Sequence, residues 1–286
     1  MADQALNAWG WDSAWPAPAK LNLFLHVVGR RADGYHLLQT VFRFIDRADT
    51  LRFAPRQDGE IHLLTPIPGV SPEQDLTVRA ACRLQFESGC SLGADITLEK
   101  RLPMGGGLGG GSSDAATVLL ALNHLWRLGF STKRLQQIGL ELGADVPVFI
   151  GGENAFAEGV GEALEPVMLP PAWYLVAEPA VQVPTAAIFG APELKRDTPA
   201  IQLSEWRPGL GDNDLEAVAC RRFPEVAEAL ACLRQFAPAR MTGSGACVFA
   251  EFASADEAER VLACLPENLR AWVAQGLFCH PLFRLV

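Results

Sequence analysis

The amino-acid sequence predicts an α+β protein built from two domains. Segments with the two-residue period of strands alternate with segments that have the 3.6-residue period of helices. The length of 286 residues suits two separate cores, because a typical domain has roughly 150 residues. Residues 167–173, VMLPPAW, form the most linker-like run in the chain. We therefore expect one domain at residues 1–166 and a second at residues 172–286.

The first domain is expected to open with strands. Residues 1–15 carry three tryptophans but show neither period, so we interpret them as a lead-in. Leucine and valine then recur at every second position up to Val27, which predicts a strand. Its opposite face would carry three candidate functional side chains, those of Lys20, Asn22 and His26.

The next features are a turn and a second strand. The Asp-Gly pair at residues 33–34 predicts the turn, and residues 35–46 have strand character. Tyr35 and His36 follow the turn, where an aromatic ring could stack on a base and an imidazole could offer a polar edge. Taken alone, the pair is more typical of half-buried structural residues.

The period then changes from strand to helix. Residues 94–104 alternate as a strand does and lead into a glycine-rich loop at residues 105–111. Ser112 or Ser113 is expected to cap the helix that follows, and Ser131 can cap another.

The rest of the chain alternates in the same way. Residues 144–167 are expected to form loop and strand. In the second domain we expect strands at residues 173–179 and 246–253, and helices at residues 214–223, 225–236 and 254–265. This order favours an α+β sandwich.

Charge and hydropathy narrow the class of protein. The net charge of -9 argues against a nucleic-acid partner, which requires a basic surface. No apolar run approaches the ~18 residues of a membrane span, and the first nineteen residues lack Lys and Arg. We therefore expect no membrane partner and a cytoplasmic location. The seven cysteines include no C-x-x-C pair, so we expect reduced core residues.

The glycine-rich loop is the strongest functional signal. Six of the seven residues at 105–111 are glycine, directly before a helix. Backbone without Cβ atoms can close around an anion with several N–H groups pointing inward, and the helix N-terminus adds its positive dipole end. The loop therefore predicts a phosphate site, with a merely flexible connection as the alternative.

The loop fits neither of two common phosphate motifs. Gly105, Gly107 and Gly110 satisfy G-x-G-x-x-G, but the acidic residue of a dinucleotide fold would fall within a helix, so a dinucleotide-dependent oxidoreductase is remote. Ser112 and Ser113 stand where a Walker loop needs lysine and serine. A third kind of nucleotide loop is required.

Two charged residues and a second small-residue loop are further candidates. Asp145 stands at the mouth of an apolar segment, where a carboxylate can accept a proton from a hydroxyl, although aspartate is also common in turns. Lys20, in an apolar strand, either extends its amine to water or faces an anionic site. Residues 241–246, MTGSGA, could meet a phosphate or diphosphate or form a tight turn.

Four segments together resemble the GHMP superfamily of small-molecule kinases: PAPAKLNLFL, LPMGGGLGGGSSDAAT, LGADVPVF and MTGSGACVF. More narrowly, AKLNLFLHVVGRRADGYH and GADVPVFIGGENAFAEGVGE are similar to the branch that phosphorylates 4-diphosphocytidyl-2-C-methyl-D-erythritol in non-mevalonate isoprenoid biosynthesis. The resemblance extends from Pro16 to the C-terminus. It implies an N-terminal ribosomal-protein-S5-like nucleotide-binding domain, a C-terminal ferredoxin-like α/β sandwich, and an active site in the cleft between them.

The resemblance also implies the reaction and the residues that perform it. The γ-phosphoryl group of ATP would pass to the 2-hydroxyl of the cytidyl substrate, with Asp145 as catalytic base and Lys20 as its partner. Asn22 would bind substrate. The implied ATP-binding residues are Pro103, Met104, Gly105, Gly106, Gly107, Leu108, Gly109, Gly110, Gly111, Ser112 and Ser113.

The remaining implied contacts are with the cytidyl diphosphate. Tyr35 and His36 match the family's cytidine-binding pair, and Phe189 matches the aromatic residue that closes the other side of the base. The implied contacts with the rest of the substrate are Thr185, Gly243, Ser244 and Gly245. Mg²⁺ is expected with ATP, because charge on the transferring phosphoryl group must be neutralised. The sequence singles out no metal ligand beyond the hydroxyls of Ser112 and Ser113.

Two alternatives stay open. A kinase for another alcohol, such as mevalonate or homoserine, or a diphosphomevalonate decarboxylase would have no use for the base-binding residues. A nucleotide-binding sensor would have no use for a hydroxyl-activating pair, so Lys20 and Asp145 favour an enzyme. We expect a monomer or a weak homodimer.

Overall fold

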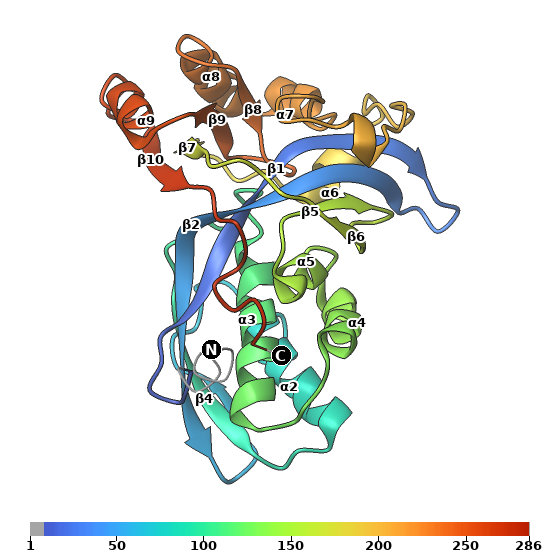
Figure 1. The fold of residues 1–286 in the computed structure, drawn as a ribbon, viewed down its shortest axis with the longest axis vertical. Helices are drawn as coiled ribbons and strands as arrows, with labels where there is room; N and C mark the ends of the chain where they lie inside the picture. The colour runs from blue at the N-terminus through green and yellow to red at the C-terminus, as the bar shows by residue number, and fades with distance from the viewer. Residues whose placement is uncertain (1–8, 286) are drawn as a thin grey trace.

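The computed structural model describes residues 9–285, which form two β-sheets covered by helices (Figure 1). The strands are β1 (Trp15–Arg30), β2 (His36–Arg56), β3 (Ile61–Leu63), β4 (Gly93–Glu99), β5 (Ala155–Glu158), β6 (Ala163–Pro166), β7 (Trp173–Glu178), β8 (Ala239–Met241), β9 (Val248–Phe252) and β10 (Arg270–Gln275). The helices are α2 (Leu76–Ser88), α3 (Gly110–Leu125), α4 (Thr132–Leu142), α5 (Val146–Gly151), α6 (Thr185–Phe189), the 3-10 turn η1 (Leu203–Glu205), α7 (Glu216–Arg222), α8 (Pro224–Leu233) and α9 (Ala255–Leu262).

The first sheet has six strands in the order β3-β4-β2-β5-β6, with β1 paired to β2. Helix α3 packs against β1 and β2 and also contacts α2, α4 and α5. Its residues from Ser113 to Asn123 are all buried, so this helix lies in the centre of the first core. The strand predicted at residues 94–104 is confirmed over residues 94–99 by β4, and residues 100–104 are not strand. The cap predicted at Ser131 is confirmed by its bond from the Arg134 backbone N–H.

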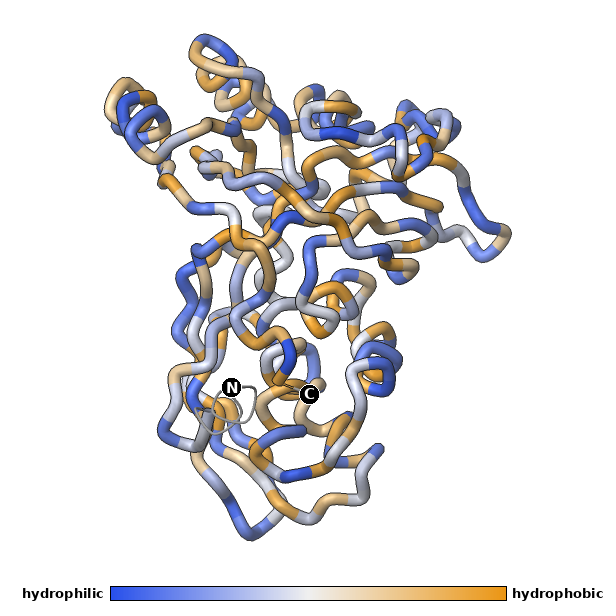
Figure 2. Tube along the Cα trace, in the orientation of Figure 1, coloured by the Kyte–Doolittle hydropathy of each residue, from blue (hydrophilic) through white to orange (hydrophobic). Residues whose placement is uncertain are grey.

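The second sheet has the antiparallel order β10-β7-β9-β8, with α8 and α9 packed on it. The chain order of strand, helices, two strands, helix and strand is the ferredoxin-like arrangement. Helices α8 and α9 carry both hydrophilic and hydrophobic stretches (Figure 2), as suits helices with one face on a sheet and one in water. The strands and helices predicted for this half of the chain are confirmed.

Strands β1 and β2 are long and contribute to both cores. Trp15 and Phe44 belong to the first core, whereas Leu25 and Val27 pack with Leu175 of β7 in the second. The change from the first sheet to the second falls between β6 and β7, in the segment where the sequence places its linker. The two long strands therefore extend from the first half of the structure into the second and connect them (Figure 1).

Two local expectations are wrong. The segment expected as loop and strand contains the helix α5, which begins with proline at one of its first two positions, where no backbone N–H is required. Of the lead-in at residues 1–15, residues 1–8 lie outside the described part of the chain and residues 9–14 form no helix or strand. Trp15 is fully buried at the start of β1, and its ring centroid lies 5.0 Å from that of Trp9. All seven cysteines are free, but Cys82 and Cys264 are exposed and only Cys247 is buried.

After β10 the chain returns to the first core. The Leu277 N–H donates to the Phe44 carbonyl at 2.8 Å, and the His280 N–H donates to the Gly152 carbonyl at 2.8 Å. The Asn154 amide donates to the carbonyls of Leu277 and Phe278. This C-terminal segment therefore holds the end of α5 in place. No helix in the described part of the chain is both long and apolar enough to cross a bilayer.

His280 makes the stability of this arrangement dependent on pH. Its ring is buried, Nδ1 accepts a hydrogen bond from the Leu282 N–H, and burial lowers the pKa of the imidazole from 6.5 to about 3. The unfolded chain binds a proton near pH 6.5, whereas the folded chain does not, so stability is lost as the pH falls below that value. We expect His280 to remove about 2 kcal/mol from the free energy of unfolding between pH 7 and pH 5.

Denaturant unfolding at the two pH values measures this loss. His280→Asn keeps an acceptor near the Leu282 N–H. Its free energy of unfolding should fall less than that of wild type between pH 7 and pH 5, by about 2 kcal/mol. His62→Asn, at a half-exposed histidine, is the matched control and should keep most of the wild-type pH dependence. Equal pH dependence in wild type and His280→Asn would contradict the prediction.

Candidate active site

Strand β1 carries the lysine of the site, but its alternation is interrupted. One extra residue enters β1 between Asn22 and Leu25, where the register against β2 shifts. Leu25 therefore follows Lys20 and Asn22 on the wall of the cleft. His26 lies on the other face, with its ring centroid 4.9 Å from that of Phe24. The expectation that His26 shares a face with Lys20 is wrong, because the bulge reverses the alternation.

The Lys20 amine is buried and makes three polar contacts. It donates to Asn22 Oδ1 at 2.6 Å and to the Gly107 carbonyl at 3.1 Å, and it lies 3.2 Å from Asp145 Oδ2. Two of the three ammonium protons make these two hydrogen bonds, and the contact with Asp145 is an ion pair. The amine is therefore fixed in one position between the glycine loop and the carboxylate.

Asp145 is positioned by α5. It occupies the N-cap of this helix, but its side chain makes no capping bond. Its side chain is 34% exposed, compared with 3% for Lys20. One carboxylate oxygen is thus held by the lysine while the group faces the cleft, the geometry that a base for a substrate hydroxyl needs.

Asn22 lines the cleft, and its side chain also makes hydrogen bonds within the protein. Its amide group donates to the Thr40 hydroxyl at 3.0 Å while its oxygen accepts from Lys20, and the residue is 3% exposed. The Asn22 backbone N–H donates to the Thr242 hydroxyl at 3.0 Å. The side chain therefore orients the Lys20 amine in this structure.

The glycine loop has the backbone of an anion-binding nest. Gly105, Gly107 and Gly109 have φ values of 68°, 74° and 71°, and they alternate with residues whose φ is negative. Left-handed and right-handed residues in alternation turn successive N–H groups toward one side, where they can bind phosphate oxygens. Helix α3 begins directly at Gly110 and adds its N-terminus to the same site.

The serine caps expected after the loop are wrong. The N-cap of α3 is Gly109, so both serines lie inside the helix. Ser113 is buried and its hydroxyl donates to the Pro18 carbonyl at 2.7 Å. Ser112 lines the cleft, so of the two it is the hydroxyl that can reach a ligand.

The loop at residues 241–246, the second glycine loop, packs against the loop at residues 105–111. The N–H groups of Ala246 and Cys247 donate to the carbonyls of Gly105 and Gly106 at 3.2 and 3.1 Å. A Cβ on Gly107 would lie 2.1 Å from the Thr242 carbonyl oxygen, so the two backbones approach as closely as glycine permits. The two loops are therefore joined by backbone hydrogen bonds and close backbone packing.

Thr185 and Ser244 meet across the cleft, with their hydroxyl oxygens 2.8 Å apart. Phe189, one turn further along α6, lines the same cleft. Its ring centroid lies 5.0 Å from that of His36, at an interplanar angle of 36°. The structure thus brings His36 and Phe189 together, whereas Tyr35 is 65% exposed on the turn beside them.

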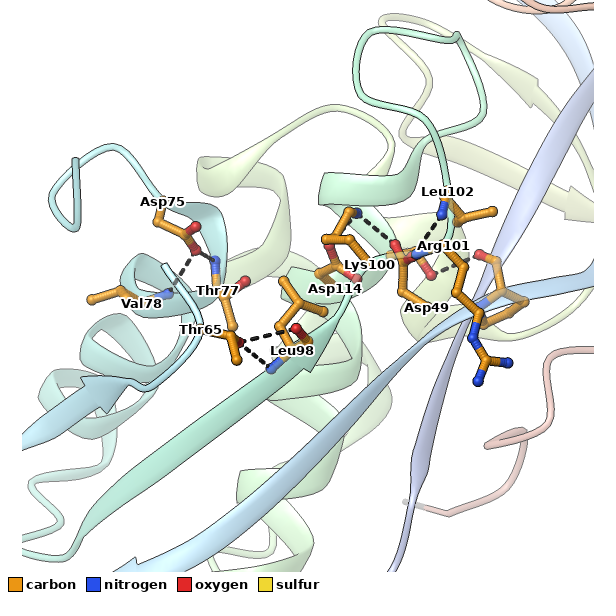
Figure 3. A network of polar contacts seen from close by, with 12 residues as sticks. Asp49, Thr65, Asp75, Thr77, Val78, Leu98, Lys100, Arg101, Leu102 and Asp114 are labelled. Atoms are coloured by element: carbon orange, nitrogen blue, oxygen red, sulfur yellow. Dashed lines mark hydrogen bonds and ion pairs between the residues drawn. The ribbon is translucent and has the colours of Figure 1, made fainter. Parts of the chain in front are cut away.

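An ion-pair network that the sequence analysis missed anchors the segment that leads into the loop at residues 105–111 (Figure 3). The Lys100 amine lies between the carboxylates of Asp49 and Asp114. Asp49 also accepts from the backbone N–H groups of Arg101 and Leu102, at 2.6 and 2.8 Å, directly before the glycine loop. Lys100 could have been noticed from its place before the loop, but nothing in the local sequence marks Asp49.

The three charged groups of this network affect one another's pKa values. Burial raises the pKa of Asp114 to about 7; the Asp49 charge adds to this rise and Lys100 opposes it. Burial alone would lower the pKa of Lys100, but the carboxylates of Asp114 and Asp49 raise it overall. The lysine therefore stays charged while anchoring the segment that leads into the loop.

These elements enclose a cleft of about 630 Å³, within the range of small-molecule sites. Among the residues predicted from sequence, it is lined by Lys20, Asn22, Pro103, Met104, residues 105–111, Ser112, Asp145, Thr185, Phe189, Gly243, Ser244 and Gly245. Ser113, Tyr35 and His36 are not part of its lining. The cleft thus joins both glycine loops, the lysine and the aspartate.

Comparison with known proteins identifies the family of the chain. Residues 75–153 match the model of the GHMP kinases N terminal domain, and residues 195–271 match that of the GHMP kinases C terminal domain. The 4-diphosphocytidyl-2-C-methyl-D-erythritol kinase of Dechloromonas aromatica is 70% identical over 272 residues, covering 95% of this chain and 99% of the relative. The chain belongs to this family of GHMP kinases.

Further comparisons support the family membership. The 4-diphosphocytidyl-2-C-methyl-D-erythritol kinase of Aromatoleum aromaticum is 61% identical, covering 93% of this chain and 94% of the relative. A crystal structure of 4-(cytidine 5'-diphospho)-2C-methyl-D-erythritol kinase is 37% identical with a TM-score of 0.79, covering 92% of this chain and 99% of that chain. A mevalonate kinase structure shares only the fold, at 14% identity and a TM-score of 0.65, over 93% of this chain and 99% of that one.

Membership in the 4-diphosphocytidyl-2-C-methyl-D-erythritol kinase family confirms the resemblance and the two-domain GHMP fold expected from the sequence. The protein is therefore a phosphotransferase that uses ATP. The oxidoreductase alternative is wrong, because the glycine loop belongs to a kinase domain.

Proposed function

We propose that this kinase transfers the γ-phosphoryl group of ATP to the 2-hydroxyl of 4-diphosphocytidyl-2-C-methyl-D-erythritol, giving the 2-phosphate and ADP. The observation that carries the proposal is the Lys20–Asp145 pair, which faces the same cleft as the glycine nest. The names of the relatives support the acceptor. This reaction would place the enzyme in the non-mevalonate route to isoprenoids.

The chemistry follows from the position of the pair. Asp145 would accept the proton of the 2-hydroxyl while the hydroxyl oxygen forms a bond to the γ-phosphorus. The bond from this phosphorus to the bridging oxygen then breaks, and ADP leaves with that electron pair. Lys20 would orient Asp145 and offset the charge of the phosphoryl group. Most of the rate enhancement in such reactions comes from positioning and electrostatics, which a fixed amine supplies.

The phosphates of ATP would lie in the nest of residues 105–111. No group of three His, Cys, Asp or Glu side chains within residues 9–285 could hold a metal by itself. Mg²⁺ bound mainly by ATP phosphates and water fits such a cleft, with Ser112 as a group of this chain that could contact it. When bound, the ion would neutralise phosphate charge.

The other end of the cleft suits a nucleoside diphosphate. The second glycine loop, with the hydroxyls of Ser244 and Thr185, would contact the diphosphate of the acceptor. Phe189 and Tyr35 would stack on the two faces of the cytosine ring, and His36 would contact its edge. Asn22 would act through Lys20. We also propose a cytoplasmic monomer or weak homodimer with no nucleic-acid or membrane partner, and a domain boundary at residues 167–173.

ADP formation from Mg-ATP tests the proposal. We expect turnover with 4-diphosphocytidyl-2-C-methyl-D-erythritol, and none with mevalonate, homoserine or without an acceptor. A Tyr35→Ala, Phe189→Ala double variant should raise the KM of the cytidyl substrate at least about tenfold, since base stacking is worth about 1–3 kcal/mol, and leave the KM of ATP unchanged. Turnover with another alcohol, or an unchanged KM for the cytidyl substrate, would contradict the acceptor assignment. ATP binding without turnover on any acceptor would favour a sensor.

A further inference from the structure

Arg196 contacts His36, whose ring packs against Phe189 of the cleft lining. Its Nε donates to His36 Nε2 at 3.0 Å. Its two terminal nitrogens donate to the carbonyls of Leu194, Phe189 and Ala191, at 2.9, 3.1 and 2.6 Å. The guanidinium is thus held by three carbonyl groups and presents one fixed N–H to the imidazole.

This contact determines where His36 carries its proton. A guanidinium can only donate, so Nε2 must offer a lone pair, and a neutral imidazole then has its proton on Nδ1. Burial lowers the pKa of His36, and the nearby charges of Arg196 and Arg30 lower it further, so the ring is neutral. Nδ1 has no partner among the described residues and is not among the buried polar atoms, so this N–H can meet a ligand.

We propose that Arg196 is a specificity-determining residue: by holding His36 in the Nδ1–H tautomer, it makes the enzyme accept a cytosine base and reject a uracil base. Cytosine N3 is an acceptor and pairs with a donor, whereas uracil N3 carries a hydrogen and would leave two donors facing each other. A site built around one hydrogen bond rejects a partner that leaves its polar group unpaired. This inference rests on the proposed function, in which His36 contacts the edge of the base.

The tautomer can be measured directly in the free enzyme. Two-bond ¹H–¹⁵N spectra of ¹⁵N-histidine-labelled protein distinguish a protonated ring nitrogen from an unprotonated one, and the chain has five histidines. A His36→Asn variant identifies the signals of His36. We expect Nδ1 protonated and Nε2 unprotonated near neutral pH. A His36 ring protonated on Nε2, or on both nitrogens, would overturn the proposal.

Kinetics with two acceptors tests the consequence. The wild-type chain should prefer the cytidyl acceptor over its uridyl analogue in kcat/KM, and Arg196→Met should reduce this preference at least about tenfold. Arg196→Lys keeps a donor and should retain more of the preference. Arg222→Met is the matched control, because Arg222 donates to the Ala187 carbonyl of the same segment without contacting His36; its preference should equal that of wild type.

The outcomes separate the two proposals. Wild-type turnover with the cytidyl acceptor, combined with an unchanged base preference in Arg196→Met, would overturn the role of Arg196 alone. An equal loss of preference in Arg222→Met would also overturn it, since the effect would then belong to the segment. A wild-type chain that ignores the cytidyl acceptor would remove the proposed function and the specificity role with it.

Discussion

Asp145→Asn is expected to lower turnover at least ~10²-fold, the contribution of a positioned base, while ATP binding stays close to that of wild type. Asparagine has the shape of aspartate and can still accept from the Lys20 amine, so the position of the lysine should change little. The amide cannot accept the hydroxyl proton. The nest of residues 105–111, which would bind the phosphates, is not part of this change.

Two measurements check this result: kcat by ADP formation at saturating substrates, and ATP affinity by calorimetry without acceptor. Asp256→Asn provides the control for loss of one negative charge, because Asp256 lies in the first turn of α9 and does not line the cleft. It should have wild-type turnover. Near-normal turnover in Asp145→Asn would remove this residue from the role of base.

Gly107→Ala is expected to damage both stability and catalysis, whereas Gly105→Ala should be milder. Both glycines have positive φ, so either alanine should cost about 1–2 kcal/mol of backbone strain. A Cβ at Gly105 meets nothing within 4 Å, but one at Gly107 would lie 2.1 Å from the Thr242 carbonyl oxygen. Overpacking typically adds 1–3 kcal/mol, so we expect Gly107→Ala to cost about 3 kcal/mol or more.

The loss of catalysis has the same structural cause. The Gly107 carbonyl accepts from the Lys20 amine, and a shift of this backbone would move the amine from Asp145. Misplacement of a catalytic group by about 1 Å can cost ~10²-fold in rate. Denaturant unfolding and kcat measure the two effects. Equal losses in the two alanine variants would mean that the close approach of the glycine loops is unimportant.

Secondary structure and the phosphate loop could be predicted from residues that are neighbours in the chain. Glycine occupies each of the positions 105, 107 and 109 that have positive φ, so the nest is encoded locally. The Ser131 cap needs only the Arg134 backbone N–H, three residues away. The resemblance to GHMP kinases added Lys20 and Asp145 as a pair, which spacing alone had left open.

What the sequence by itself determined is therefore the order of elements, the anion loop and the family; the geometry of the site was decided by tertiary structure. The bulge that turns His26 away depends on the register between β1 and β2. Arg196 meets His36 across 160 positions of sequence, and Asp49 reaches Lys100 across 51. Such contacts depend on how distant segments pack, because a side chain far along the chain leaves no periodic signal beside its partner.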